Sequence, residues 1–229
     1  QEGFTKLVRH AYDNGIRFFE TADSYTGMPQ MLATALKGIP RDSYKLMTKY
    51  RPSDTSDPKT TIDRFRSELN SEYFYILLIH CIRTPNWMEE MKRLQDEFSE
   101  AKQKKIILSH GASCHGLQPL RTFAGSNWLD VALLRVNHLG VRMDTMSTRD
   151  PDELGDVAEV ASHVKKIRGR GTGILGMKLI GEGRFTNFED RDKAIKFAFD
   201  NGVESVTIGY KSPAEVDEAI GRMKRVLNA

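Results

Sequence analysis

Three short segments carry residues whose types could do acid–base chemistry together. The segment FFETADSYTG, residues 18–27, runs two aromatic residues into Glu20 and presents Tyr25 five residues later. Two further apolar runs lead into Lys49 and His80. A phenol can give a proton to an oxygen that gains negative charge, although its ordinary pKa of about 10 is high. A nearby ammonium would lower that pKa, and a carboxylate would hold the ammonium in place.

Taken singly, each of these residues also has an ordinary structural explanation. A lysine at the end of a strand is usually a solvated charge, and a lone tyrosine usually fills a gap in packing. A histidine beside an apolar run is often buried and satisfied by its neighbours. The interpretation as a site therefore depends on the elements that carry the residues.

Short apolar runs alternate with longer amphipathic runs along the chain. Strands are predicted at 16–20, 44–48, 73–79, 106–112, 131–136, 172–178 and 204–209. Helices are predicted at about 2–14, 29–37, 58–71, 86–103, 116–124, 153–168, 189–201 and 212–227. Several of the strand runs are continuously apolar, as expected for strands covered on both faces. This alternation indicates a parallel sheet.

The fold class favoured is α/β, a (β/α)8 TIM barrel formed as one domain over residues 1–229, with its first strand expected upstream of Gln1. A doubly wound open sheet is the alternative, but that fold usually has a GxGxxG turn after its first strand, and none is present. In a barrel, chemistry lies at the carboxyl ends of the strands. The predicted strands deliver polar residues to that one rim.

Composition excludes several classes of function. The 229 residues carry a formal charge of only +3, so neither a nucleic acid nor a membrane surface is an expected partner. The basic run KKIRGRG, residues 165–171, is interpreted as the end of a helix, where cations suit the dipole. No run is long enough to span a membrane, and no signal peptide is visible. Two cysteines, Cys81 and Cys114, lack CxxC spacing, so a reducing compartment, the cytoplasm, is expected.

Five motifs, in order, carry a resemblance to a known family. FFETADSYTG resembles the DTAxxYG motif of the aldo-keto reductases, LMTKY resembles their strand-end lysine, and YILLIHCI their histidine segment. GASCHG takes the place of the family's GxSN turn, and SVTIGYKSPAEVDEA is similar to its C-terminal cofactor segment. The resemblance covers residues 1 to about 227. It implies a soluble, bacterial-type, NAD(P)H-dependent oxidoreductase that reduces the carbonyl of a small aldehyde or ketone.

The resemblance also implies a role for each of the four residues. Tyr25 is expected to be the general acid and Lys49 to tune it. Glu20 is expected to pair with Lys49, although the family almost always has aspartate at this position. His80 is expected to orient the carbonyl.

The resemblance implies NADP as the cofactor. NAD is the alternative, because Glu215 stands where NADP-preferring relatives have an arginine, and its carboxylate would repel the 2′-phosphate. Lys211 is expected to compensate. The residues expected to bind the cofactor lie at strand ends and in the C-terminal segment, and they are Ser113, Cys114, Asn137, Met177, Lys178, Gly209, Lys211, Ser212 and Glu218. Cys114 replaces the family's asparagine, so His115 or Asn137 is expected to supply the missing hydrogen bond.

Two other functions stay open on the sequence. One is a metal-dependent barrel hydrolase that would use His80, Cys81, Cys114 and His115, although neighbouring residues on a strand point to opposite faces. The other is a nucleotide-binding barrel with weak or lost catalysis that acts as a regulatory subunit. The substrate is expected to depend on the loops at 51–58 and 138–153 and on the C-terminal tail. Within 138–153, Arg142 and Arg149 could contact an acidic or sugar-like substrate.

Overall fold

The structure of the chain is a computed structural model, and it describes residues 1–54, 56–147 and 152–228. The chain divides into two compact units. The first unit comprises Gln1–His80, Arg93–His110 and Tyr210–Ala219, and the second Cys81–Lys92, Gly111–Gly209 and Ile220–Ala229. The single domain expected over residues 1–229 stays a prediction.

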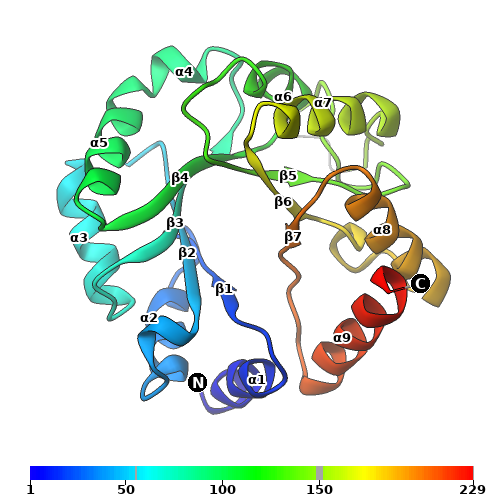
Figure 1. Cartoon of the computed structure of the whole chain (residues 1–229), viewed down its shortest axis with the longest axis horizontal. Coiled ribbons are helices and arrows are strands. Elements are labelled where there is room, and N and C mark those ends of the chain that lie inside the picture. The colour runs from blue at the N-terminus through cyan, green and yellow to red at the C-terminus, as the bar shows by residue number, and fades with distance from the viewer. Residues whose placement is uncertain (55, 148–151, 229) are drawn as a thin grey trace. The chain divides into compact units, whose positions relative to one another are not determined.

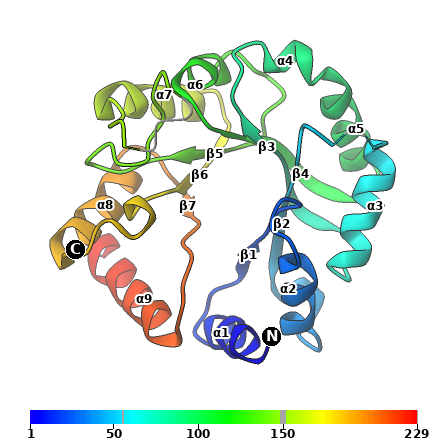
Figure 2. The same ribbon diagram turned by 180° about the vertical axis from the view of Figure 1, so that it is seen from behind.

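The first unit contains three parallel strands and the helices between them. In chain order these are α1 (Glu2–Asp13), β1 (Phe18–Glu20), α2 (Met28–Leu36), the 3-10 helix η1 (Arg41–Ser43), β2 (Lys45–Tyr50), α3 (Pro58–Glu68) and β3 (Phe74–Ile82), whose last two residues lie in the second unit. Most of α5 (Lys92–Gln103) and the start of β4 (Ile107–Cys114) also belong to the first unit. Phe18 pairs with Lys45, and Met47 with Ile76. In Figures 1 and 2, α2 and α3 lie along the same side of these strands.

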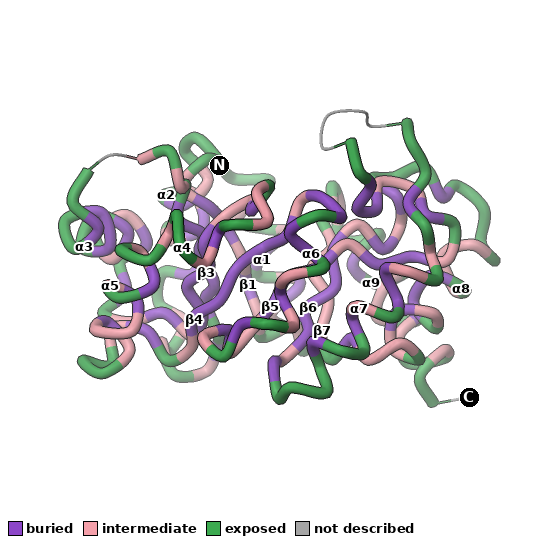
Figure 3. Tube along the Cα trace, turned by 90° about the horizontal axis from the view of Figure 1, so that it is seen from above, coloured by how far each residue is buried: buried purple, intermediate pink, exposed green. Residues whose placement is uncertain are grey.

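The core of the first unit is aromatic where helices meet the sheet. Tyr50 at the end of β2 is wholly buried, and its ring lies 6.1 Å from Phe65 of α3 and 5.9 Å from Phe98 of α5. The strand residues are mostly buried (Figure 3), as continuous apolar runs require. Helix α3 begins where its sequence predicts, because the Asp57 carboxylate accepts the Thr60 amide at 3.1 Å.

The second unit continues the alternation. It contains α4 (Trp87–Glu90), the end of β4, α6 (Leu117–Phe123), β5 (Val131–Arg135), α7 (Val157–Gly169), β6 (Gly173–Met177), the 3-10 helix η2 (Gly181–Gly183), α8 (Phe188–Asp200), β7 (Ser205–Val206) and most of α9 (Pro213–Leu227), whose first turns belong to the first unit. Strands β4, β5, β6 and β7 pair in parallel in that order. Helices α6 and α7 lie side by side in both ribbon views.

The predicted parallel alternation is confirmed, with differences at the ends of elements. Strands β2, β3 and β4 run further than predicted, so that Lys49, His80 and Ser113 lie inside strands rather than beyond them. The predicted helix at 86–103 is two helices, α4 and α5. Helix α7 begins four residues later than predicted because Asp156 caps it, accepting the Glu159 amide at 2.9 Å.

Two glycines close the long loop that precedes α7. Gly140 has a φ of +72°, and its carbonyl accepts the Gly155 amide at 2.9 Å. A Cβ at position 140 would lie 2.3 Å from the Gly155 carbonyl oxygen, so only glycine fits. In the part of the chain that the structure describes, no helix is long and apolar enough to cross a membrane.

Candidate active site

A short turn after β1 carries Tyr25, and backbone hydrogen bonds fix this turn against β2. The Thr21 amide donates to the Met47 carbonyl at 3.0 Å, and the Asp23 amide donates to the Lys49 carbonyl at 3.1 Å. These bonds continue the β1–β2 pairing past the end of β1. The Tyr25 amide then turns back to the Ala22 carbonyl at 3.0 Å. The position of Tyr25 is therefore set by the register of two strands.

The side chain of Asp23 links the same turn to two arginines. Its carboxylate lies 3.0 Å from the Arg64 guanidinium of α3 and 3.9 Å from Arg51. Arg64 also pairs with Glu68 at 3.1 Å, so α3 and the turn share one charged network. This network could not be predicted from the sequence, because Asp23 and Arg64 lie 41 residues apart in the chain.

Lys49 has its ammonium buried beside two oxygen acceptors. Its side chain is only 2% exposed, and Nζ donates to the Glu20 carboxylate and, at 3.0 Å, to the Thr21 carbonyl. A buried ammonium is costly unless it is paired and hydrogen-bonded. Although glutamate is one methylene longer than the aspartate usual at this position, the Glu20 carboxylate still pairs with Lys49.

Tyr25 and His80 complete the group. The Lys49 Nζ lies 4.8 Å from the centroid of the Tyr25 ring. The His80 and Tyr25 rings meet edge to face, with centroids 6.0 Å apart and an interplanar angle of 86°. Tyr25 is 40% exposed, so solvent and small molecules can reach it. The structure thus brings together all four residues predicted from the sequence, within one unit.

The turn also supplies a contact that sequence analysis missed. The Ser24 hydroxyl lies 3.3 Å from Nδ1 of His80. The two residues are 56 positions apart, and no spacing pattern links a serine on a turn to a histidine in a later strand.

The predicted cofactor residues of β4 make internal hydrogen bonds. The Ser113 hydroxyl accepts the Cys81 amide at 2.7 Å, and Cys81 itself has a φ of +65°. The Cys114 thiol is wholly buried and donates to the Gly116 carbonyl at 3.3 Å. Burial raises the pKa of the Cys114 thiol well above its ordinary value, and the nearby Asp144 carboxylate adds to the rise. Cys114 is therefore a neutral thiol.

Asn137, beyond the end of β5, is buried and organises the following loop. Its amide nitrogen donates to the carbonyls of Val141 at 2.7 Å and Lys178 at 3.2 Å. Its amide oxygen accepts the amides of Leu139 and Val141 at 3.1 Å and 3.2 Å. All four hydrogen-bonding positions of this side chain are thus used within the protein. Asn137 has no spare donor for a carboxamide in this conformation.

Met177 ends β6 and is buried, whereas Lys178 directly follows it in a left-handed conformation with a φ of +60°. The Lys178 ammonium contacts the Glu182 carboxylate, and Arg142 lies 2.8 Å from the other Glu182 oxygen. The hydrogen bond from Lys178 lowers the pKa of Glu182 below its ordinary value. Arg142 is thus part of an ion-pair cluster, and Arg149 lies outside the described residues.

The start of α9 carries the C-terminal candidates. The Ser212 hydroxyl accepts the Glu215 amide at 3.3 Å, and the Glu215 carboxylate accepts the Lys211 amide at 2.7 Å. This reciprocal cap places a carboxylate at the amino end of the helix. Gly209 and Glu218 are exposed.

A buried carboxylate in the second unit was not predicted. Asp144 is wholly buried, accepts the Gly116 amide at 2.7 Å, and lies 3.8 Å from Nε of Arg135. Its burial raises its pKa to about 6. The residue fastens the loop after Asn137 to the turn that begins α6.

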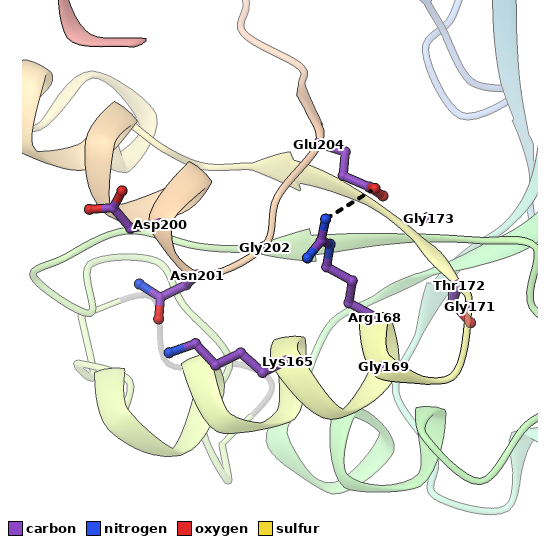
Figure 4. A pocket seen from close by; sticks show the side chains of 10 residues that line it. All are labelled: Lys165, Arg168, Gly169, Gly171, Thr172, Gly173, Asp200, Asn201, Gly202 and Glu204. Atoms are coloured by element: carbon purple, nitrogen blue, oxygen red, sulfur yellow. Dashed lines mark ion pairs between the residues drawn. The ribbon is translucent and has the colours of Figure 1, made fainter. Parts of the chain in front are cut away.

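A pocket of about 490 Å³ lies elsewhere in the second unit (Figure 4). It is lined by Gly173 at the amino end of β6 and by four charged side chains, those of Lys165, Arg168, Asp200 and Glu204. Arg168 pairs with Glu204 at 3.7 Å. The cofactor-binding residues predicted in this unit lie at the carboxyl ends of strands, whereas this pocket lies at the amino end of β6. The pocket is therefore separate from the predicted cofactor residues. Among the described residues, no group of three or more His, Cys, Asp or Glu side chains could hold a metal ion.

Comparisons with known proteins agree with the geometry. The sequence profile of the Aldo/keto reductase family matches residues 2–203. No curated protein matches the sequence significantly.

Among solved structures, one described as an aldo-keto reductase from Pseudomonas aeruginosa has a TM-score of 0.76 at 18% identity, covering 99% of this chain and 84% of that chain. The holo form of an aldo-keto reductase from Bacillus halodurans has a TM-score of 0.75 at 16% identity, covering 96% and 81%. An aldo/keto reductase from Klebsiella pneumoniae, solved in complex with NADP and acetate, has a TM-score of 0.69 at 14% identity, covering 97% and 80%. At these identities the matches establish the fold, and the predicted (β/α)8 barrel class is confirmed.

Proposed function

Because the chain belongs to the aldo/keto reductase family of oxidoreductases, we propose that it reduces the carbonyl of a small aldehyde or ketone to an alcohol, with Tyr25 as the proton donor. One observation carries the proposal. The buried ammonium of Lys49 pairs with the Glu20 carboxylate and lies 4.8 Å from the ring centroid of the exposed Tyr25.

The chemistry requires a proton at a defined atom. When hydride reaches a carbonyl carbon, negative charge develops on the carbonyl oxygen, and a positioned acid must protonate it. Tyr25 is 40% exposed at the end of a fixed turn, so a small carbonyl compound can approach this side chain. Lys49 stabilises the negative charge that the phenol oxygen acquires when it gives up its proton.

Glu20 and His80 support this step in different ways. Glu20 keeps the Lys49 ammonium in place and compensates the charge of this buried group. The His80 ring packs edge to face with that of Tyr25, and His80 would donate a hydrogen bond to the same carbonyl oxygen. Two donors that meet one oxygen fix the substrate and stabilise its developing charge.

NADPH is the proposed cofactor, with NADH as the alternative, and it would supply the hydride. The family uses NADP(H), and the Klebsiella relative was solved with NADP. The residues of this chain that fit a nucleotide are the cation Lys211 and the hydroxyl of Ser212 at the amino end of α9. Glu215 beside them would repel a 2′-phosphate, which is why the margin between the two nucleotides is expected to be small.

Titration with NADPH and NADH, followed by steady-state assays on a panel of aldehydes and ketones, tests the proposal. Tyr25→Phe should lower carbonyl reduction by about 100-fold or more and leave the nucleotide Kd within about twofold. Tyr75→Phe is the matched control, because Tyr75 also lies against a lysine, with Lys45 Nζ 4.6 Å from its ring, but at the amino ends of the strands. The control should keep the parent rate. Parent-like reduction by the Tyr25 variant would show that the proton comes from another group.

The alternative, a nucleotide-binding subunit without turnover, predicts a different result. Such a protein would bind a nucleotide and reduce none of the carbonyl compounds. The direct ion pair of Glu20 with Lys49 favours the catalytic proposal, because the substitution of glutamate for aspartate has not separated the two charges.

A further inference from the structure

The Ser24 hydroxyl lies within hydrogen-bond distance of the His80 imidazole. Its oxygen lies 3.3 Å from Nδ1 of the imidazole, and Tyr25, the next residue, lies edge to face with the same ring. The two neighbouring side chains therefore contact one histidine from a single turn.

The turn is rigid enough for this contact to have a defined geometry. The Met28 amide donates to the Tyr25 carbonyl at 2.9 Å, which closes the turn into α2. The Asp23 side chain holds Arg64 at 3.0 Å, and the Asp23 amide belongs to the continued β1–β2 pairing. Ser24 lies between these fixed positions.

We infer that Ser24 is a positioning residue that donates its hydroxyl proton to Nδ1 and so holds His80 in the tautomer with its proton on Nε2. A neutral imidazole has one donor nitrogen and one acceptor nitrogen, and the hydrogen bond made by one nitrogen decides which is protonated. With Nδ1 as the acceptor, the ring proton is on Nε2, the form in which this nitrogen can donate to a substrate oxygen. This inference rests on the proposed function, which needs such a donor.

The opposite arrangement makes a clear contrast. If Nδ1 carried the proton and donated a hydrogen bond to Ser24, Nε2 would be unprotonated, and its lone pair would repel a carbonyl oxygen. A serine hydroxyl can take either part, so the tautomer itself is the quantity to measure.

The experiment is nitrogen-15 NMR of uniformly labelled protein at a pH where His80 is neutral, with the signal assigned by its loss in His80→Gln. The expected result is a protonated Nε2 and a hydrogen-bonded, unprotonated Nδ1. Ser24→Ala should shift the Nδ1 resonance and mix the tautomers, and Ser24→Thr, which keeps a hydroxyl, should restore the parent pattern. Thr26→Ala is the matched control, since Thr26 is exposed on the same turn, and it should change nothing.

Kinetics give a second readout. Ser24→Ala should lower kcat for carbonyl reduction by about fivefold, the size of one ordinary hydrogen bond, while the KM for the nucleotide stays constant. Ser24→Thr should recover the rate. A purely structural role for Ser24 would instead change stability without moving the tautomer.

The two proposals fail in different ways. A parent protein with the proton on Nδ1, or a Ser24→Ala spectrum identical to the parent spectrum, overturns the inference about Ser24 even if the enzyme reduces aldehydes well. If no carbonyl compound is reduced but the spectra behave as expected, Ser24 still sets the tautomer and only the proposed reaction falls.

Discussion

The buried carboxylate of Asp144 predicts a specific dependence of stability on pH. Asp144 is wholly buried, and its burial raises its pKa to about 6 from the ordinary 3.8. The Arg135 guanidinium opposes this rise, but at 3.8 Å it does not cancel it. Folding therefore favours the protonated form of this group, and the charged form opposes folding.

The sign and size of the effect follow from linkage. Below pH 3.8 the carboxyl is protonated in both the folded and the unfolded chain, so its ionisation has no effect on stability. Between pH 3.8 and about 6 the unfolded chain ionises while the folded state keeps its proton, so the free energy of unfolding falls across this range and levels off above it. The loss is small at pH 4 and amounts to about 3 kcal/mol at pH 7.5.

Asp144→Asn removes the ionisation and keeps a carbonyl acceptor for the Gly116 amide. Urea unfolding of both proteins at pH 4 and pH 7.5 measures the change. The variant should gain about 2 to 3 kcal/mol relative to the parent between these two pH values, because acid effects common to both proteins cancel in the difference. The exposed Asp42 provides the control, since Asp42→Asn should change the same difference by less than about 0.5 kcal/mol. Parallel pH profiles for the parent and Asp144→Asn would refute the reasoning.

Three further variants test other parts of the structure. Glu20→Gln leaves the buried Lys49 ammonium without a counter-charge, so the free energy of unfolding should fall by about 2 kcal/mol and carbonyl reduction by about 100-fold, as measured by urea unfolding and steady-state kinetics. Glu215→Gln removes a carboxylate from the amino end of α9, so fluorescence titration should show tighter binding of NADPH by about fivefold and unchanged binding of NADH. Gly140→Ala puts a Cβ against the Gly155 carbonyl, so thermal unfolding should show a loss of at least about 2 kcal/mol; a Tm equal to that of the parent would mean that the loop can move aside.

The fold was predictable because its signals are local. Continuous apolar runs such as YFYILLI predict buried strands, and the cap formed by Asp57 and Pro58 begins α3 where the sequence indicates. The ends of strands were less predictable. Strand β2 runs on through Lys49 because the ion pair with Glu20 lets a charged residue stay buried, and hydropathy alone ends the strand before it.

The four candidate catalytic residues were predicted because their order in the chain resembles a family pattern, whereas the contacts that support them were not. Ser24 and Asp23 act through residues on later elements, His80 and Arg64, and nothing in the local sequence marks such pairs. Asp144 shows the same limit. An aspartate in a polar loop predicts exposure, and only the folded chain reveals that it is buried beside Arg135.

The candidate active site is coupled to the pairing of β1 with β2 more closely than to any single side chain. The amides of Thr21 and Asp23 bond to carbonyls of β2, one of them that of Lys49 itself. The backbone that presents Tyr25 is therefore tied to the backbone of the residue whose ammonium meets its ring. A slip of one residue between these strands would turn Lys49 to the other face of the sheet and separate it from Glu20. Strand β1 has only three residues, but the buried Glu20–Lys49 ion pair and the hydrogen bonds of the turn both form only in this register, so both stabilise it.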